Sequence, residues 1–396
     1  MTAHAPIAAP LAVRDQFPAI AGWHYLDSAA TAQKPRAVID AIAKAYGRDY
    51  ATVHRGVYER SATMTRSFEA ARAAAGALIG GKPDETIFTR GATEAINLVA
   101  RCAPREGRNR VLLSQLEHHS NIVPWQLAGY AIDVVPLTTD GEIDLDAAER
   151  MANANHAFLA FAHVSNVLGS VLDARRAAKI AHSVGARLLL DGCQAAPRLP
   201  VDVAEIGCDF YAYSGHKLYG PTGIGVLWGR AELLAGMAPW QGGGAMIDRV
   251  TFDGSTWLDP PARFEAGTPH IVGAIGLHAA IDWVREIGVE RLHAHEARLA
   301  RRCREALREV DGLTLFGPED SAGIVSFALD GVHPHDIGTI LDDEKVAIRA
   351  GHHCAQPLMD HLGVPATARA SFAAHSDDSD IDALVRGLGK VKRIFG

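Results

Sequence analysis

The sequence predicts an α/β fold in which a large domain built on a mostly parallel sheet precedes a smaller α+β domain. Short apolar runs typical of strands alternate with Ala-rich helical stretches from about residue 68 to residue 230. The alternation stops in a stretch rich in Gly and Pro, residues 231–270, and a long helical run follows. Alternating strands and helices are typical of a parallel sheet with helices on both faces, and the change of pattern indicates a second domain. We therefore expect an N-terminal arm (1–20), a large domain (21–270) and a small C-terminal domain (271–396).

Each predicted strand of the large domain is a short apolar run bounded by polar or turn residues. These strands are 86–89, 110–114, 132–136, 157–161, 187–190, 209–213 and 223–228, and they bracket helices such as 67–79 and 173–184. In the small domain we expect one long helical run at 272–307, strands near 313–315 and 324–328, and a helix near 334–341. The last segment, 376–393, predicts an amphipathic packing helix whose apolar face carries Ile381, Leu384, Val385, Leu388 and Val391.

The composition is that of an ordinary soluble globular protein. Of 396 residues, 48% are hydrophobic and 21% are charged, and the net charge of −7 gives no reason to expect nucleic acid or an anionic membrane as a partner. The first ten residues lack the basic start and apolar core of a secretory signal, and no apolar run is long enough to span a membrane. The five cysteines show no regular spacing, so neither a disulfide framework nor a zinc ribbon is indicated. We expect a reduced, cytoplasmic protein.

Asp191 and Lys217 are the most informative pair of residues. Asp191 ends one predicted strand, and Lys217 follows the next one in the run Tyr213-Ser-Gly-His-Lys217, so both lie at the same edge of the sheet. A carboxylate that pairs with a pyridinium nitrogen, beside a lysine that forms a Schiff base, is the minimal chemistry of pyridoxal 5'-phosphate. Taken singly, each residue has an ordinary alternative to a cofactor role: Asp191 could cap a helix, and Lys217 could be a surface lysine.

Further polar residues follow other predicted strands and complete a cofactor site. Thr93, in Thr89-Arg-Gly-Ala-Thr-Glu94, opens a helix where backbone N–H groups can cradle a phosphate, together with Ser214 and His216. His118 could stack on a planar ring, and Asn166 could hydrogen-bond a phenolic oxygen. The alternatives are a plain helix start for Thr93, an exposed loop histidine for His118 and a turn cap for Asn166.

Cys354 is a candidate nucleophile. It stands in Arg349-Ala-Gly-His-His-Cys354, where two neighbouring imidazoles can support a thiolate or carry its proton. The alternatives are a buried apolar cysteine and a zinc site, and the zinc site is disfavoured because adjacent residues rarely all face one ion. Arg369 is predicted to clamp a substrate carboxylate through two parallel hydrogen bonds, with a surface arginine as the alternative.

In these motifs the chain resembles the group II, or SufS-type, cysteine desulfurases of the class V aminotransferase family, which have the fold-type I architecture of pyridoxal-phosphate-dependent transferases. The resemblance covers almost the whole chain, and the lysine and cysteine motifs occur in the same order. The matching runs are Val53-His-Arg-Gly56, Arg90-Gly-Ala-Thr-Glu94, Glu117-His-His-Ser-Asn121, His163-Val-Ser-Asn166, Asp191-Gly-Cys-Gln194, Ser214-Gly-His-Lys217, Arg263-Phe-Glu-Ala-Gly-Thr268 and Arg349-Ala-Gly-His-His-Cys354.

The resemblance implies a role for each cofactor-binding residue. It implies that Lys217 forms the covalent link and moves protons, that His118 stacks on the ring and that Asp191 pairs with the pyridine nitrogen. Hydrogen bonds to the phenolic oxygen side are implied for Asn166 and Gln194. It implies that Thr93, Ser214 and His216 hold the phosphate together with Thr268 from a second subunit. The protein is therefore implied to be a homodimer.

For the substrate, the resemblance implies that Arg369 binds the carboxylate of L-cysteine and that His54 and Arg349 line the cavity. Cys354, carried by the small domain, is implied to attack the substrate sulfur, leaving L-alanine and a Cys354 persulfide. No resident metal is expected.

The sequence departs from the family pattern at two positions. Ala92 stands where many relatives have Thr, so that one hydroxyl for the phosphate is missing. Cys193 is usually a smaller residue; we expect it to be structural, with a second oxidisable thiol as the alternative. In addition, the run Val332-His-Pro-His-Asp336 resembles relatives that work with a zinc-bearing, SufU-like acceptor, in which the histidine matching His335 can take over a zinc ligand position. The alternative is a histidine at a helix start.

Together, these observations predict a homodimeric, cytoplasmic L-cysteine desulfurase that supplies sulfur for iron–sulfur cluster assembly through an acceptor of SufE or SufU type. The nearest alternative is a selenocysteine lyase, because the same site would accept L-selenocysteine. A further alternative is another class V aminotransferase-type reaction in which Cys354 is a bystander. A non-enzymatic sulfur-transfer scaffold is disfavoured, since it would not need Lys217, Asp191, Arg369 and Cys354 together.

Overall fold

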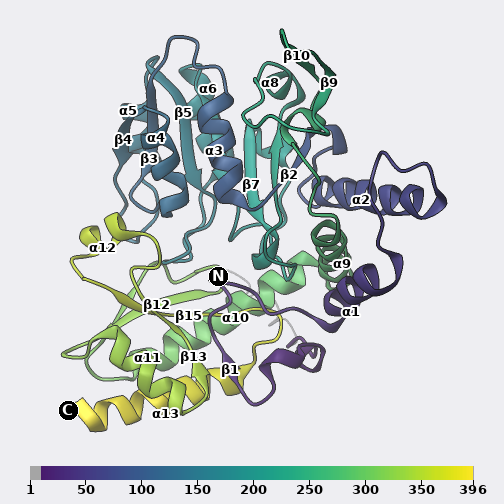
Figure 1. The fold of residues 1–396 in the computed structure, drawn as a ribbon. Helices are drawn as coiled ribbons and strands as arrows, with labels where there is room; N and C mark the ends of the chain where they lie inside the picture. Colours follow the sequence, from purple (N-terminus) through teal and green to yellow (C-terminus); the bar gives the residue numbers. More distant parts are fainter. Residues whose placement is uncertain (1–9, 396) are drawn as a thin grey trace.

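A seven-stranded sheet forms the centre of the larger part of the molecule (Figure 1). The computed structural model describes residues 10–395, so the predicted N-terminal arm lies partly outside the described residues. The strand order is β2-β8-β7-β6-β5-β3-β4, and the five strands from β7 to β4 are parallel, whereas β8 and β2 are antiparallel to their neighbours. The bounds are β2 Thr86–Thr89, β3 Arg110–Ser114, β4 Ala131–Val135, β5 His156–Ala162, β6 Arg187–Asp191, β7 Phe210–Ser214 and β8 Gly225–Gly229. The prediction of a mostly parallel sheet is confirmed.

The sheet is buried on both faces, which explains its nearly continuous apolar strands. Along β6, Leu188 and Leu190 pack in the same apolar cluster as α2 (Glu59–Ala77) and α6 (Ala174–Ser183). Leu189 points the other way, into the cluster that contains α3 (Ala92–Cys102). Successive side chains of a strand point to opposite faces, so one apolar run binds both helical layers.

The smaller part of the molecule is built on a four-stranded antiparallel sheet of order β11-β12-β15-β14 (Figure 1). Its strands are β11 Leu313–Phe316, β12 Ile324–Leu329, β14 Arg349–Gly351 and β15 Thr367–Ser371, and its helices are α10 Val289–Arg308, α11 Pro334–Asp343 and α13 Asp378–Phe395. On α13, Ile381, Leu384, Leu388 and Val391 are buried in the core and Val385 packs at its edge, so the predicted apolar face is confirmed.

Two predicted helix limits are wrong. The run predicted as one helix at 272–307 is two helices, α9 (Ile271–Ile287) and α10, because Gly288 adopts a φ of +92° that ends the first helix. Helix α2 begins at Glu59 and not at residue 67. Its first two turns are rich in Ser, Thr and Arg, which gives no apolar period for a sequence pattern to detect.

Two packing contacts bring distant segments together. Helix α9 packs against α1 (Arg36–Lys44) and α2, and the short strand β1 (His24–Tyr25) pairs with β13 (Val346–Ala347). The domain limits at residues 20 and 270 stay predictions.

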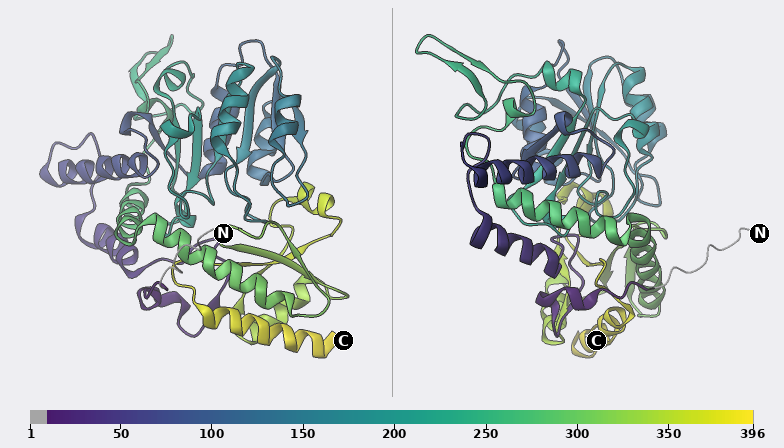
Figure 2. Two further views of the ribbon diagram at one scale, coloured as in Figure 1. Left: turned by 180° about the vertical axis from the view of Figure 1, so that it is seen from behind. Right: turned by 90° about the vertical axis from the view of Figure 1, so that its right-hand side faces the viewer.

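The remaining regular elements are short. They are α4 Val123–Leu127, α5 Leu145–Met151, α7 Val203–Ile206, α8 Ala231–Ala235, α12 Gln356–Leu362, β9 Ile247–Val250 and β10 Ser255–Trp257. The β9–β10 hairpin extends away from the main body at the upper left of the right-hand view in Figure 2. Within residues 10–395, no helix has the length and apolar character needed to cross a membrane.

Candidate active site

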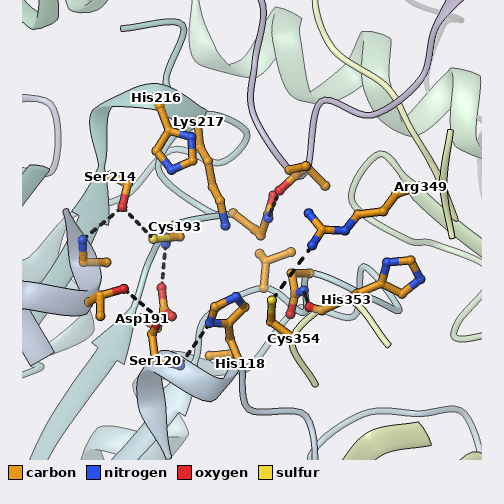
Figure 3. A pocket seen from close by; sticks show the side chains of 18 of the residues that line it. His118, Ser120, Asp191, Cys193, Ser214, His216, Lys217, Arg349, His353 and Cys354 are labelled. Atoms are coloured by element: carbon orange, nitrogen blue, oxygen red, sulfur yellow. Dashed lines mark hydrogen bonds between the residues drawn. The ribbon is translucent and has the colours of Figure 1, made fainter. Parts of the chain in front are cut away.

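A cavity of about 160 Å³ lies where the parallel strands of the large sheet end (Figure 3). Side chains reach it from the loops after β3, β5, β6 and β7, from the start of α3, and from β14 and β15 of the smaller sheet. The predicted site residues that line it are Thr93, His118, Asn166, Asp191, Gln194, Ser214, His216, Lys217, Arg349, Cys354 and Arg369. Residues that are up to 276 positions apart in sequence, Thr93 and Arg369, therefore meet at one edge of the sheet.

Two predicted residues lie elsewhere in this chain. His54 is exposed, and its Nε2 lies 2.9 Å from Oε1 of Glu69. Thr268 lines a separate surface depression beside Arg90 and Glu94. The roles of both residues stay predictions.

Asp191 and Lys217 reach the cavity from the neighbouring strands β6 and β7. These strands run parallel, so their carboxyl ends meet at the same edge. Asp191 is buried, and its Oδ1 accepts a hydrogen bond of 3.0 Å from the backbone N–H of Cys193. Lys217 lies on a 3₁₀ turn directly after β7 and extends into the middle of the cavity (Figure 3). The carboxylate and the lysine thus have the relative placement that the sequence predicts.

The N-terminus of α3 forms the end of the cavity that suits a phosphate. Ser214 Oγ accepts hydrogen bonds from the Ala92 N–H (2.9 Å) and from the Cys193 thiol (3.5 Å), so its own proton is left to donate to a third group. Thr93 Oγ1 lies 2.8 Å from Ser120 Oγ, and His216 Nδ1 lies 3.2 Å from Thr31 Oγ1. Hydroxyl and imidazole groups beside a helix N-terminus match a phosphate dianion. The residues present therefore fit pyridoxal phosphate at this end.

His118 is a neutral imidazole beside the cavity. Burial, and next the positive charge of Lys217, lower the pKa of His118 to about 4. Its Nδ1 accepts a hydrogen bond of 3.1 Å from the Ser120 N–H, which fixes the ring orientation. A neutral, oriented imidazole suits stacking on a planar ring.

Glu117 is a residue whose importance the sequence pattern does not reveal. Its side chain is fully buried and accepts hydrogen bonds from Ser114 Oγ (2.5 Å), Asn121 Nδ2 (2.7 Å) and the Ala162 N–H (3.1 Å). Burial raises the pKa of Glu117 to about 7. By joining the ends of β3 and β5 to the turn at 118–121, Glu117 holds His118 in place. The one signal in the sequence is its position directly before His118.

Cys354 lies on a tightly shaped loop. His353 and Cys354 adopt positive φ angles of 50° and 59°, a left-handed conformation that is rare for residues other than Gly. The Cys354 carbonyl accepts a hydrogen bond of 2.7 Å from the His119 N–H, and His119 Nε2 accepts one of 3.1 Å from the Gln356 N–H. The loop is therefore bound to the turn that carries His118, which fixes the thiol at the cavity.

The other cysteines are placed for packing. Burial raises the pKa of Cys193 to about 12, that of Cys303 to about 12 and that of Cys102 to about 11, so these thiols stay protonated at neutral pH. Cys193 borders the cavity, where its thiol donates to Ser214, in agreement with the structural role expected for it. Among residues 10–395, no three His, Cys, Asp and Glu side chains are grouped to hold a metal ion.

Arg369 is buried at the cavity, so the alternative of a surface arginine is wrong. It is 1% exposed, its Nη2 donates to Asp27 Oδ1 at 3.0 Å, and its Nη1 donates to the Asn166 carbonyl at 2.7 Å. Burial lowers the pKa of Arg369 to about 10, which leaves it cationic at neutral pH. Its Nε has no hydrogen-bond partner among the described residues. On the neighbouring strand β14, Arg349 stands directly opposite Arg369, and so two guanidinium groups border the cavity.

Comparison with known proteins gives one consistent family. The model of the aminotransferase class-V family matches residues 24–384. A probable cysteine desulfurase of Halalkalibacterium halodurans is 48% identical over 381 residues, which cover 94% of each chain. The cysteine desulfurase of Dickeya dadantii is 48% identical and covers 94% of this chain and 92% of its own.

Solved structures agree in fold. The crystal structure of the cysteine desulfurase CsdA from Escherichia coli superimposes with a TM-score of 0.91 at 40% identity, covering 97% of this chain and 98% of its own. The apo structure of a cysteine desulfurase from Thermococcus onnurineus has a TM-score of 0.92 at 36% identity and covers 98% of each chain. The matched region includes both sheets and every element that contributes to the cavity. The chain therefore belongs to the aminotransferase class-V family.

Proposed function

We propose that this protein is a pyridoxal-phosphate-dependent L-cysteine desulfurase that gives L-alanine and a persulfide on Cys354. The observation that carries the proposal is that the Cys354 thiol lines the same cavity as Lys217, Asp191 and Arg369. A lysine and a carboxylate alone would fit many reactions of amino acids with this cofactor. The added thiol favours sulfur transfer, and the relatives that carry the name cysteine desulfurase support the same conclusion.

The cofactor is held by residues already placed around the cavity. Thr93, Ser214 and His216 would bind its phosphate, His118 would stack on its ring, and Asp191 would pair with its ring nitrogen, since all five residues line the cavity. Asn166 and Gln194, which line the same cavity, would hydrogen-bond the phenolic oxygen of the cofactor. When bound, pyridoxal phosphate would supply an electron sink for the electrons released at Cα of the substrate.

Arg369 orients the substrate. Its guanidinium binds the carboxylate of L-cysteine and is itself fixed by Asp27 and by the Asn166 carbonyl. A planar guanidinium can bind both carboxylate oxygens. Lys217, at the centre of the cavity, accepts the proton from Cα and returns a proton to the product (Figure 3).

Cys354 receives the sulfur. Its thiolate attacks the sulfur of the substrate, a new S–S bond forms, and the carbon–sulfur bond breaks with its electron pair remaining on carbon, which then takes up a proton. One cysteine and one Cys354 thiol thus give one alanine and one Cys354 persulfide, with no external oxidant or reductant. Arg349, whose Nη2 lies 3.9 Å from Cys354 Sγ, stabilises negative charge on the sulfur.

We infer a cytoplasmic homodimer of the SufS type in which Thr268 serves the site of the opposite subunit, and a SufE- or SufU-type protein as sulfur acceptor for iron–sulfur cluster assembly. The exposed His333 and His335 rings stack at 5.4 Å at the start of α11, where a zinc-bearing acceptor would find them accessible.

The test is the reaction of the purified protein, loaded with pyridoxal phosphate, with L-cysteine. We expect alanine in solution and an added mass of one sulfur on the peptide that contains Cys354. In Cys354→Ser both products should fall to background while the absorption of the bound cofactor still responds to cysteine, because a neutral hydroxyl is a poor nucleophile. Cys102→Ser, which removes a thiol at the far end of α3, is the matched control and should retain both products.

Alanine and persulfide formation by Cys354→Ser at the wild-type rate would refute the proposal. If the wild type forms no persulfide and releases alanine only from L-selenocysteine, the selenocysteine lyase is favoured instead.

A further inference from the structure

The side-chain amide of Gln194 has one allowed orientation. Its Nε2 lies 2.8 Å from the Ala29 carbonyl, and its Oε1 lies 2.7 Å from Nη1 of Arg198. A carbonyl oxygen only accepts hydrogen bonds and a guanidinium only donates them. If the amide were turned over, an acceptor would face an acceptor and a donor would face a donor. Arg198 and Ala29 together therefore determine which end of the amide is which.

This orientation leaves one hydrogen of Gln194 for the cavity. An amide nitrogen carries two hydrogens, and one of them is used by the Ala29 carbonyl. Gln194 is 2% exposed and lines the cavity, so the second hydrogen is available to a group bound there. An N–H group that points into a cavity is a ready donor to an oxygen anion.

Arg198 is held from the opposite side by Glu296 of α10. Arg198 Nε lies 2.9 Å from Glu296 Oε2 in a buried ion pair, although the two atoms are not aligned for a hydrogen bond. Arg198 Nη1 donates in addition to the Gln194 carbonyl (3.2 Å), and Nη2 donates to the Phe372 carbonyl (3.5 Å). These contacts fix the guanidinium with respect to the backbone on both sides of the cavity.

Glu296 is fixed in turn. Tyr219, two residues after Lys217, donates to Glu296 Oε1 at 3.3 Å and accepts from the Ala374 N–H at 3.1 Å. A Cβ atom at Gly323 would come within 2.9 Å of Glu296 Oε2, so the carboxylate has little room to move. The buried pair is thus a rigid unit that connects α10 to the loops after β6 and β7.

We propose that Arg198, held by Glu296, is a positioning residue that keeps the N–H of Gln194 directed at the phenolic oxygen of the bound cofactor. The inference rests on the proposed function, since it concerns the same cavity. Without Arg198 only the Ala29 carbonyl opposes the reversed orientation, in which the amide presents its oxygen to the cofactor. A donor to the phenolic oxygen favours its deprotonated form, so loss of the donor should raise the pH at which the absorption of the bound cofactor changes.

The experiment compares this pH midpoint in five forms of the holoenzyme. They are the wild type, Gln194→Met, the double variant Arg198→Met/Glu296→Met, the triple variant that combines all three changes, and Arg304→Met. The double variant replaces a buried ion pair by unbranched apolar side chains, a change that proteins often tolerate. Arg304→Met is the matched control. Arg304 is a buried arginine on α10, the helix that carries Glu296, and its side chain contacts the segment 316–319.

We expect the midpoint to rise by about one pH unit in Gln194→Met, the size expected for one hydrogen bond to a charged group. The midpoint of the double variant should rise by a similar amount. The midpoint of the triple variant should rise no further than that of Gln194→Met, because the Arg198–Glu296 pair acts through Gln194. Arg304→Met should lower the denaturant midpoint of unfolding but leave the pH midpoint unchanged. Arg198→Lys, which keeps a donor beside Gln194 and a charge beside Glu296, should remain near the wild-type midpoint.

A wild-type pH midpoint in the double variant, or shifts that add fully in the triple variant, would overturn the inference while the proposed function stands. Failure of the wild type to bind pyridoxal phosphate would refute the proposed function itself. If the double variant does not fold, Glu296→Gln loosens Arg198 without removing it and should give a smaller rise in the same direction, and an unchanged midpoint there would likewise overturn the inference.

Discussion

Arg349 lies at the start of the loop that carries Cys354, and its Nη2 donates a hydrogen bond to Cys354 Sγ across 3.9 Å (Figure 3). The guanidinium and the thiol enter the cavity from the same short segment, β14 and the turn that follows it. The cation of Arg349 is therefore placed beside the sulfur, whereas Arg369, on the neighbouring strand β15, binds Asp27. This arrangement separates the two arginines by role.

Arg349→Met should slow sulfur transfer without removing the cofactor. The charge that stabilises the attacking sulfur is lost, and a hydrogen bond to a charged group contributes about 1.5–3 kcal/mol, or roughly 10- to 100-fold in rate. The measurement is the single-turnover rate of Cys354 persulfide formation, with the rate of alkylation of Cys354 by iodoacetamide as a second readout. Unchanged rates in both assays would show that Arg349 does not act on the sulfur.

Arg369→Lys should raise the KM for L-cysteine more than it changes kcat. An ammonium group cannot bind both carboxylate oxygens in the geometry of a guanidinium, and the lost hydrogen bond predicts a rise of roughly 10-fold or more. Steady-state kinetics, with the cofactor content measured by absorption, would check this. An unchanged KM would indicate that the carboxylate is bound elsewhere, with Arg349 as the next candidate.

Asp191→Asn should strongly reduce activity. A neutral amide no longer stabilises the protonated ring nitrogen, and removal of one partner of a buried charge pair costs about 2–5 kcal/mol, or roughly 30-fold or more in kcat. The variant should still fold, because an amide oxygen can accept the hydrogen bond from the Cys193 N–H. Alanine production at the wild-type rate would exclude Asp191 as the partner of the ring nitrogen.

Acid should destabilise the fold below pH 6.5. Burial lowers the pKa of His118, His163 and His216 to about 4, that of His375 to about 3 and that of His353 to about 2, from an ordinary value of 6.5. Between pH 6.5 and pH 4 the unfolded chain binds protons at these positions and the folded chain does not, so the free energy of unfolding falls as the pH falls. We expect a loss on the order of 1 kcal/mol for each histidine by pH 5, measured by denaturant unfolding at pH 7 and pH 5.

Glu117 provides the control for this pH dependence because its sign is opposite. Its pKa is raised to about 7 in the folded state, so the folded chain binds a proton there between pH 7 and pH 4.5 that the unfolded chain does not. This proton adds stability as the pH falls. Glu117→Gln removes that gain, and its stability should fall more steeply on acidification than that of the wild type. A slope no steeper than the wild-type slope would contradict the assignment.

The sequence by itself determined the large sheet and the edge at which the chemistry lies. Strands such as Arg187–Asp191 and Phe210–Ser214 are short apolar runs whose signal is local, and parallel strands end at one edge wherever the remaining chain lies. Local patterns alone therefore suffice to place Asp191 and Lys217 together. The apolar face of Asp378–Phe395 was equally readable, because helical periodicity depends only on neighbours along the chain.

Only the tertiary structure decided what depends on contacts between distant residues. The strands Arg349–Gly351 and Thr367–Ser371 are short and rich in Ala and Gly, and their conformation comes from pairing with each other and with Ile324–Leu329. The burial of Arg369 against Asp27 spans 342 residues of sequence, and the pairing of Arg198 with Glu296 joins two segments with no pattern in common. Local propensity carries no information on such pairs, because the energy that selects them arises when the surrounding chain has excluded water from them.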